Sequence, residues 1–180
     1  MRASLSRWML SRLERHTPEW IIRAEVQILM NLASRSFRRP GKKVWRLSAG
    51  EALRTYAAYT AECMANTEAD PERLYACAFR LGEGLRRMTG LRDQRDVRRL
   101  IFYLYQNIRI PMSGSLPGKI TMRSCYFSAF YSQEQCKLMS NADAGIIAGL
   151  YGGGKLQFTQ RITGGCRQCK AVFSEGGTRS

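Results

Sequence analysis

Four of the six cysteines lie in the last third of the chain, at spacings that could do chemistry. Two of them form a C-x-x-C pattern, and thiolates at this spacing can bind one metal ion together. With the other two they could hold zinc or an iron–sulfur cluster through four thiolates, for redox chemistry or small-ligand sensing. The candidate metal ligands are Cys125, Cys136, Cys166 and Cys169.

Cys136 is also a candidate nucleophile. Ser132 and Gln135 form a predicted capping box, so Cys136 lies in the first turn of the helix that this box opens. A thiol near a helix N-terminus has its pKa lowered by the helix dipole and the free N–H groups. Asp143 shares the same helix face and could orient the reaction or exchange protons. Cys169 is the second candidate nucleophile.

A third interpretation makes the same residues structural. Cysteine is often buried as a small hydrophobe, which is also what the apolar helix faces around Cys63 and Cys77 predict. Asp143 could be a solvated helix residue, and Gln160 could be a hydrogen-bonded core amide. The residue pattern leaves the metal, catalytic and structural interpretations open.

Several site classes are disfavoured by the sequence. The chain has one histidine, His16, which excludes a His-rich zinc site and disfavours a Cys–His pair. The glycines of Gly152–Gly154 follow a helix and lack the GxxxxGK[ST] pattern, so they predict a helix end and turn rather than a phosphate loop. The chain has no zinc-finger spacing or RNP-like sequence, and therefore no specific nucleic-acid motif.

The elements that position these residues begin with helices. From Ile21 to Phe37, apolar residues recur at helical spacing. Pro18 separates this helix from a short leading helix over residues 5–13. The segment RRPGKK, residues 38–43, is a predicted loop. These patterns predict a helical N-terminal half.

Capping residues place the next three helices. Ser48 and Glu51 form a capping box that opens the first of them. Asp70–Pro71 is an N-cap followed by proline at the first helical position, and that helix ends at Gly90. Asp93 caps the third, which runs to about residue 106.

The pattern changes after residue 111. Residues 112–118 predict a linker or turn, and residues 119–131 predict a strand that contains Cys125. The helix that follows runs to about residue 150, and strands over 155–163 and 168–173 pair as a hairpin. We therefore predict an α+β fold in a single domain, residues 1–180. A helical part, 1–110, packs on a cysteine-bearing β-α-β-β part, 119–173.

The chain is strongly basic, with a formal net charge of +15. Residues 1–47 carry eleven Lys or Arg and three Glu, a net charge of +8. Such a segment favours an acidic membrane surface or another polyanion, although a solvated basic face without a partner is equally expected. The N-terminus lacks the apolar region of a secretory signal, and no apolar run is long enough to span a bilayer. We expect a cytoplasmic protein.

The last third resembles the L-2-amino-thiazoline-4-carboxylic acid hydrolase-like family. The likeness covers residues 119–173 and follows one order of features: RSCYF, then CKLMSNAD, AGLYGGG, KLQFTQRIT, a Gly-Gly turn and CKAVF. The chain departs from the family pattern by placing Cys166 in the glycine turn. A looser similarity extends to vinyl-reductase-type domains and iron-containing carotenoid isomerases.

The resemblance implies hydrolytic opening of a small heterocyclic amidine ring that carries a carboxylate. Carried over by position, Cys136, Asp143 and Cys169 would form the catalytic site. Arg161 or Lys155 would be available for the carboxylate of a small anionic substrate. Gln160, an amide in the apolar row of the same strand, is a further candidate substrate-binding residue.

Overall fold

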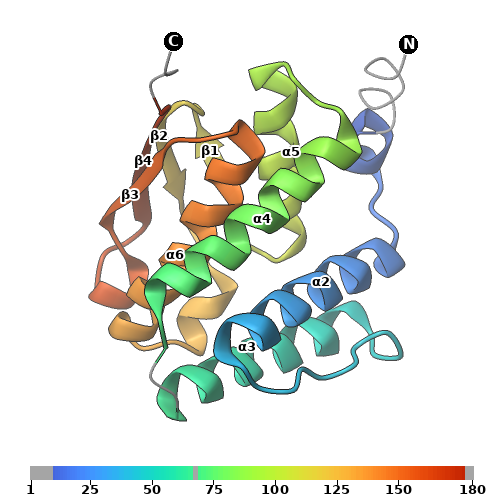
Figure 1. The fold of residues 1–180 in the computed structure, drawn as a ribbon, viewed down its shortest axis with the longest axis vertical. Helices are drawn as coiled ribbons and strands as arrows, with labels where there is room; N and C mark the ends of the chain where they lie inside the picture. Colours follow the sequence, from blue (N-terminus) through green and yellow to red (C-terminus); the bar gives the residue numbers. More distant parts are fainter. Residues whose placement is uncertain (1–9, 67–68, 177–180) are drawn as a thin grey trace.

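The computed structural model describes residues 10–66 and 69–176. The fold is α+β: a helical N-terminal part is followed by a four-stranded antiparallel sheet that packs with helix α6 (Figure 1). Residues 10–15 form a helical segment that belongs to the predicted leading helix. Residues 5–9 of that prediction lie outside the described residues.

The long helices agree with the capping pattern of the sequence. Ser48 and Glu51 hydrogen-bond reciprocally at the start of α3, and Ser132 and Gln135 do so at the start of α6. Asp70 accepts hydrogen bonds from two backbone N–H groups of α4. The helices are α2 (Glu19–Phe37), α3 (Ala49–Asn66), α4 (Pro71–Thr89), α5 (Gln94–Asn107) and α6 (Gln133–Tyr151).

The sheet has the strand order β1-β2-β4-β3, and each neighbouring pair is antiparallel. Cys169, Ala171 and Phe173 of β4 are buried and alternate with exposed residues. One face of the sheet therefore packs on the core, as the period of two requires. The strands are β1 (Met112–Gly114), β2 (Gly118–Met122), β3 (Lys155–Gln160) and β4 (Cys169–Ser174).

Three boundaries in the second half differ from the sequence prediction. Residues 112–118 are not a linker, because β1 and the turn into β2 occupy them. The strand predicted over 119–131 ends at Met122, and a 3-10 helix, η1 (Tyr126–Ala129), follows, so Cys125 lies outside any strand. The strand predicted to residue 163 ends at Gln160, and a second 3-10 turn, η2 (Ile162–Gly164), leads into β4.

Helix α6 is central to the molecule. It packs closely against α4, and in Figure 1 the sheet lies to one side of it, with the α2–α3 pair on the other. Close approach of α4 and α6 depends on glycines: a Cβ at Gly149 would come within 2.3 Å of the Phe79 carbonyl oxygen. The position of α6 brings its residues to both the sheet and the helical part.

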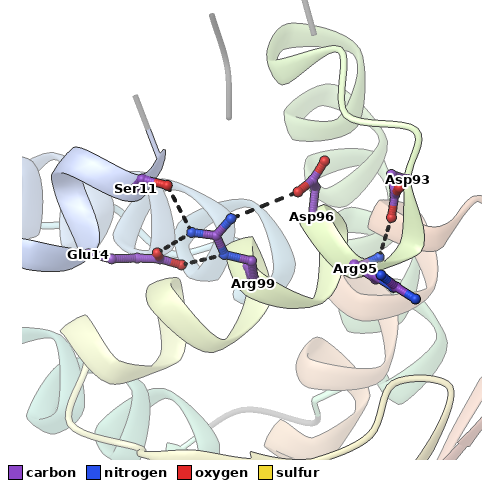
Figure 2. A network of polar contacts seen from close by, with 6 residues as sticks. All are labelled: Ser11, Glu14, Asp93, Arg95, Asp96 and Arg99. Atoms are coloured by element: carbon purple, nitrogen blue, oxygen red, sulfur yellow. Dashed lines mark hydrogen bonds and ion pairs between the residues drawn. The ribbon is translucent and has the colours of Figure 1, made fainter. Parts of the chain in front are cut away.

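Arg99 joins the N-terminal helical segment to α5 (Figure 2). Its guanidinium donates to both carboxylate oxygens of Glu14, at 2.6 and 3.2 Å, and to the Ser11 hydroxyl at 3.0 Å. Asp96, one turn before Arg99 on α5, lies 4.0 Å away. Residues 10–15 are thereby held against α5 by a bidentate, charge-assisted contact.

Within the described ranges, 10–66 and 69–176, no helix combines the length and the apolar character needed to cross a membrane.

Candidate functional site

A cavity of about 260 Å³ lies among α2, α4, α5, α6 and η1. Its walls are mostly hydrocarbon, from residues such as Ile28, Leu29, Leu81, Leu85, Leu104 and Ile146. A concave, mainly apolar cavity with a few polar groups is the usual form of a small-molecule site. The polar groups in this one therefore decide what chemistry it can support.

Cys136 and Asp143 both line this cavity. They lie seven residues apart on α6, so their Cα atoms are separated by about 10 Å along the helix axis. Two helical turns place them on the same side, as the sequence predicts. A small ring between them could contact both side chains.

The Asp143 carboxylate is held by the Tyr105 hydroxyl, which donates to Oδ1 at 2.8 Å. Burial raises the pKa of Asp143 to about 6, and the Tyr105 hydrogen bond and the Arg161 charge partly oppose this rise. The pKa of Tyr105 is itself raised, first by burial and then by the charge of Asp143. A carboxyl that titrates near neutral pH can both accept and donate a proton.

Thr163 supplies an unsatisfied polar atom to the same cavity. Its Oγ1 is buried and has no hydrogen-bond partner among the described residues, although a buried hydroxyl is normally paired. The η2 turn between β3 and β4 places it there. A bound molecule with a hydrogen-bonding group would satisfy this atom.

Arg161 lies next to the catalytic candidates on α6. Its Nη2 donates to the Ser140 hydroxyl at 3.1 Å, and its guanidinium carbon is 4.8 Å from the Phe158 ring centroid. Ser140 is one turn after Cys136, and the Arg161 charge lowers the pKa of Asp143. The Nε of Arg161 is buried and finds no partner in the part of the chain that the structure describes. Arg161 does not line the cavity, but its contact with Ser140 places it beside the α6 face that carries Cys136 and Asp143.

Cys169 and Cys125 have surroundings that oppose a thiolate. Burial raises the pKa of Cys125 to about 12. Burial also raises the pKa of Cys169, whose Sγ accepts a hydrogen bond from the Ile162 N–H at 3.3 Å. Cys125 lines the cavity, whereas Cys169, buried at the start of β4, is not one of its lining residues. Cys136 is therefore the better placed nucleophile.

The remaining predicted residues lie apart from this group. Lys155 and Gln160 are exposed on β3, so Gln160 is not a core amide. Across the described part of the chain, no three Cys, His, Asp or Glu side chains are grouped as a metal site would require. The structure does not gather Cys125, Cys136, Cys166 and Cys169 into such a group, and all six cysteines are free thiols.

Sequence reasoning missed Thr163 of η2 and two further polar residues of the cavity. Tyr105 of α5 holds Asp143, and Glu25 of α2 also lines the cavity. Glu25 had a readable signal, because it interrupts the apolar stripe between Ile21 and Ile28 at helical spacing. Tyr105 had none, since an aromatic residue in a helix is normally core.

Comparison with known proteins adds no assignment: no protein-family model matches this chain, and no curated protein matches it.

Proposed function

We propose that the protein is a hydrolase that opens the C–N bond of a small cyclic amidine in the cavity beside Cys136. The observation that carries this proposal is that Cys136 and Asp143 line one cavity, two helical turns apart, with space for a small ring between them. The family resemblance of residues 119–173 supports the choice of a thiazoline-like ring as the substrate.

The proposed reaction uses the thiolate of Cys136 and the carboxyl of Asp143. The thiolate adds to the amidine carbon, and the ring C–N bond breaks as the nitrogen takes a proton from Asp143. Water then adds to the same carbon, gives a proton to Asp143 and displaces the thiolate. The sum is hydrolysis of one C–N bond, with both residues regenerated.

Arg161 is the proposed group for the carboxylate of an anionic substrate. An arginine can bind a carboxylate through two parallel hydrogen bonds, and Arg161 already lies against the Cys136 face of α6. Its Nε has no partner among the described residues and is a further donor, and Arg161 itself stands outside the cavity wall. Lys155, the other candidate, is exposed on β3.

The test is turnover of 2-amino-thiazoline-4-carboxylate by matched variants. We expect Cys136→Ser to lower kcat at least about a hundredfold, because a serine hydroxyl is a far weaker nucleophile without a base. The control Cys77→Ser should keep the wild-type rate, since Cys77 lies on α4 and does not line the cavity. Full turnover by both Cys136→Ser and Cys169→Ser would end the cysteine-hydrolase proposal.

A small-ligand sensor is the second candidate function. The observation that favours it is the mainly hydrocarbon lining of the cavity, which suits binding without chemistry. This alternative predicts that the cyclic amidine or an apolar analogue raises the melting temperature of the wild type without being converted. The sensor role and the hydrolase role thus differ in product formation.

The four-thiolate alternative remains a prediction with its own test. Zinc or an iron–sulfur cluster would require the four cysteines to move together on loading, since the structure does not group them. Metal analysis with an absorption spectrum on protein purified without air measures this. About one zinc or several irons per chain would favour the cluster.

A further inference from the structure

The cavity contains a second acid, Glu25, that the proposed reaction does not use. Its Oε2 accepts a hydrogen bond from the Asn107 side chain at 2.9 Å. No ion pair joins it to a lysine, arginine or histidine among the described residues. A carboxyl in an apolar wall without a cationic partner is costly to ionise.

Glu25 and Asp143 are separate groups in one cavity. Glu25 comes from α2 and is held by Asn107 at the end of α5, whereas Asp143 comes from α6 and is held by Tyr105. No lysine, arginine or histidine contributes to the cavity wall among the described residues, and Arg161, the proposed carboxylate group, lies outside that wall against Ser140. An anionic group on a ligand would therefore have no opposite charge on the cavity wall. A cationic group could pair with the ionised carboxylate of Glu25.

We propose that Glu25 is the counter-ion for a basic nitrogen on a mostly apolar ligand that occupies this cavity. The inference deepens the proposed function, because it rests on the same cavity being the ligand site, but it does not depend on hydrolysis. Burial raises the pKa of Glu25 to about 8, and its Asn107 hydrogen bond partly opposes this rise. An ammonium group placed beside the carboxyl would favour the charged form and bind as an ion pair.

The first test compares three probes that share one apolar body: 4-phenylbutylamine, 4-phenylbutanol and 4-phenylbutanoate. Calorimetric titration at pH 8 measures each Kd. We expect the amine to bind wild type at least about tenfold more tightly than the alcohol, and the butanoate to bind most weakly. Equal Kd values for the amine and the alcohol would overturn the proposal.

Matched variants then locate the effect. Glu25→Gln keeps the shape and the Asn107 hydrogen bond, so it should weaken amine binding about tenfold and change alcohol binding less than twofold. Glu19→Gln, at an exposed position of the same helix, should change neither. Equal losses in both variants would show that the effect is general surface charge, which contradicts the proposal.

The pH dependence of amine binding provides a test that needs no change at Glu25. The other titratable groups of the cavity are Tyr56, Tyr105, Tyr131, Cys125, Cys136 and Asp143. Asp143 ionises near pH 6 and the tyrosines and Cys125 far above 8, and the remaining thiol is removed by working in Cys136→Ser. Amine affinity should then rise between pH 7 and 9 as Glu25 ionises. A flat profile would contradict the proposal.

The two proposals can fail separately. If the amine binds through Glu25 and the cyclic amidine is not converted, the hydrolase proposal fails and the Glu25 inference stands. If the amidine is converted at Cys136 but the amine binds no better than the alcohol, the Glu25 inference fails and the hydrolase stands.

Discussion

At the residue scale, the site contains a buried carboxyl, Asp143, whose ionisation is unfavourable. Asp143 sits among tyrosines and apolar residues, and burial is the largest influence on its pKa. The hydrogen bond from Tyr105 and the charge of Arg161 limit the rise, so that the pKa stays near 6 rather than going higher. The surroundings thus bring a proton donor and acceptor close to neutral pH.

The pKa of Asp143 predicts how stability depends on pH. Because the folded-state pKa, about 6, lies above the unfolded value of about 4, this group's favourable contribution is complete below pH 4 and lost as pH rises to 6. Relative to Asp143→Asn, the free energy of unfolding of wild type should fall by up to about 1.4 kcal/mol per pH unit across that window. Urea unfolding at pH 4, 5, 6 and 7 measures the difference. Parallel profiles for the two proteins would show that Asp143 has an ordinary pKa in the folded state.

Sequence reasoning reached part of the site at this scale. Cys136 and Asp143 could be paired because both lie on one capped helix, where spacing fixes the shared face. Cys169 could not be excluded, because its burial away from the cavity lining depends on how β4 packs. Tyr105 and Thr163 come from elements far apart in the chain, and nothing local in the sequence predicts that they line the same cavity.

At the element scale, α6 carries the site and glycines set its distance from α4. A Cβ at Gly149 would lie 2.3 Å from the Phe79 carbonyl oxygen and 2.8 Å from the Glu83 nitrogen, both in the α4 backbone. A Cβ added at Gly82, on α4, would likewise lie 2.3 Å from the Ile146 carbonyl oxygen. The backbones therefore approach so closely that no side chain fits between them.

Alanine substitutions at two glycines of the α4–α6 pair, Gly149 and Gly84, should have opposite effects on the free energy of unfolding. Gly149→Ala should lower the free energy of unfolding by at least about 2 kcal/mol, because backbone cannot move aside for the new methyl group. Gly84→Ala is the matched control on α4, with no atom within 4 Å of its added Cβ. It should stabilise by roughly 0.5–1 kcal/mol through lower unfolded-state entropy. Urea unfolding measures both, and equal effects would contradict the close approach.

The helices were more predictable than the strands for a physical reason. Caps are local, so Ser48, Asp70 and Ser132 mark helix starts that the structure confirms. Short strands depend on partners distant in sequence, and β1 has only three residues. The strand expected over 119–131 ends at Met122 because its partner strand begins there. The pairing of β2 with β4 runs from Gly118–Phe173 to Met122–Cys169, and Cys169 is the first residue of β4.

At the scale of the whole molecule, basic charge and an exposed tryptophan meet in the loop between α2 and α3. Arg38, Lys42, Lys43 and Arg46 are exposed there, and the Trp45 side chain is 54% exposed. Tryptophan prefers the headgroup region of bilayers, and lysine or arginine near an acidic surface adds about 1 kcal/mol each. We propose that this loop is where residues 1–47 meet an acidic membrane surface.

Vesicle sedimentation tests whether the loop between α2 and α3 binds an acidic membrane surface. Wild type should bind phosphatidylserine-containing vesicles at low salt and release them at about 0.5 M salt, because screening removes the attraction. The double variant Lys42→Glu, Lys43→Glu should bind at least about tenfold more weakly. Arg80→Glu, Arg87→Glu carries the same charge change on exposed positions of α4 and is the control. Equal weakening in both double variants would show that net charge, not this loop, is responsible.

In the proposed reaction, Cys136 attacks a small cyclic amidine in the cavity it shares with Asp143. Rapid acid quenching of the protein with 2-amino-thiazoline-4-carboxylate, followed by peptide mass mapping, would detect this attack. We predict a covalent adduct on the peptide that contains Cys136, absent in Cys136→Ser and slower both to form and to decay in Asp143→Asn. Turnover without an adduct on Cys136, or no adduct and no turnover in wild type, would contradict it.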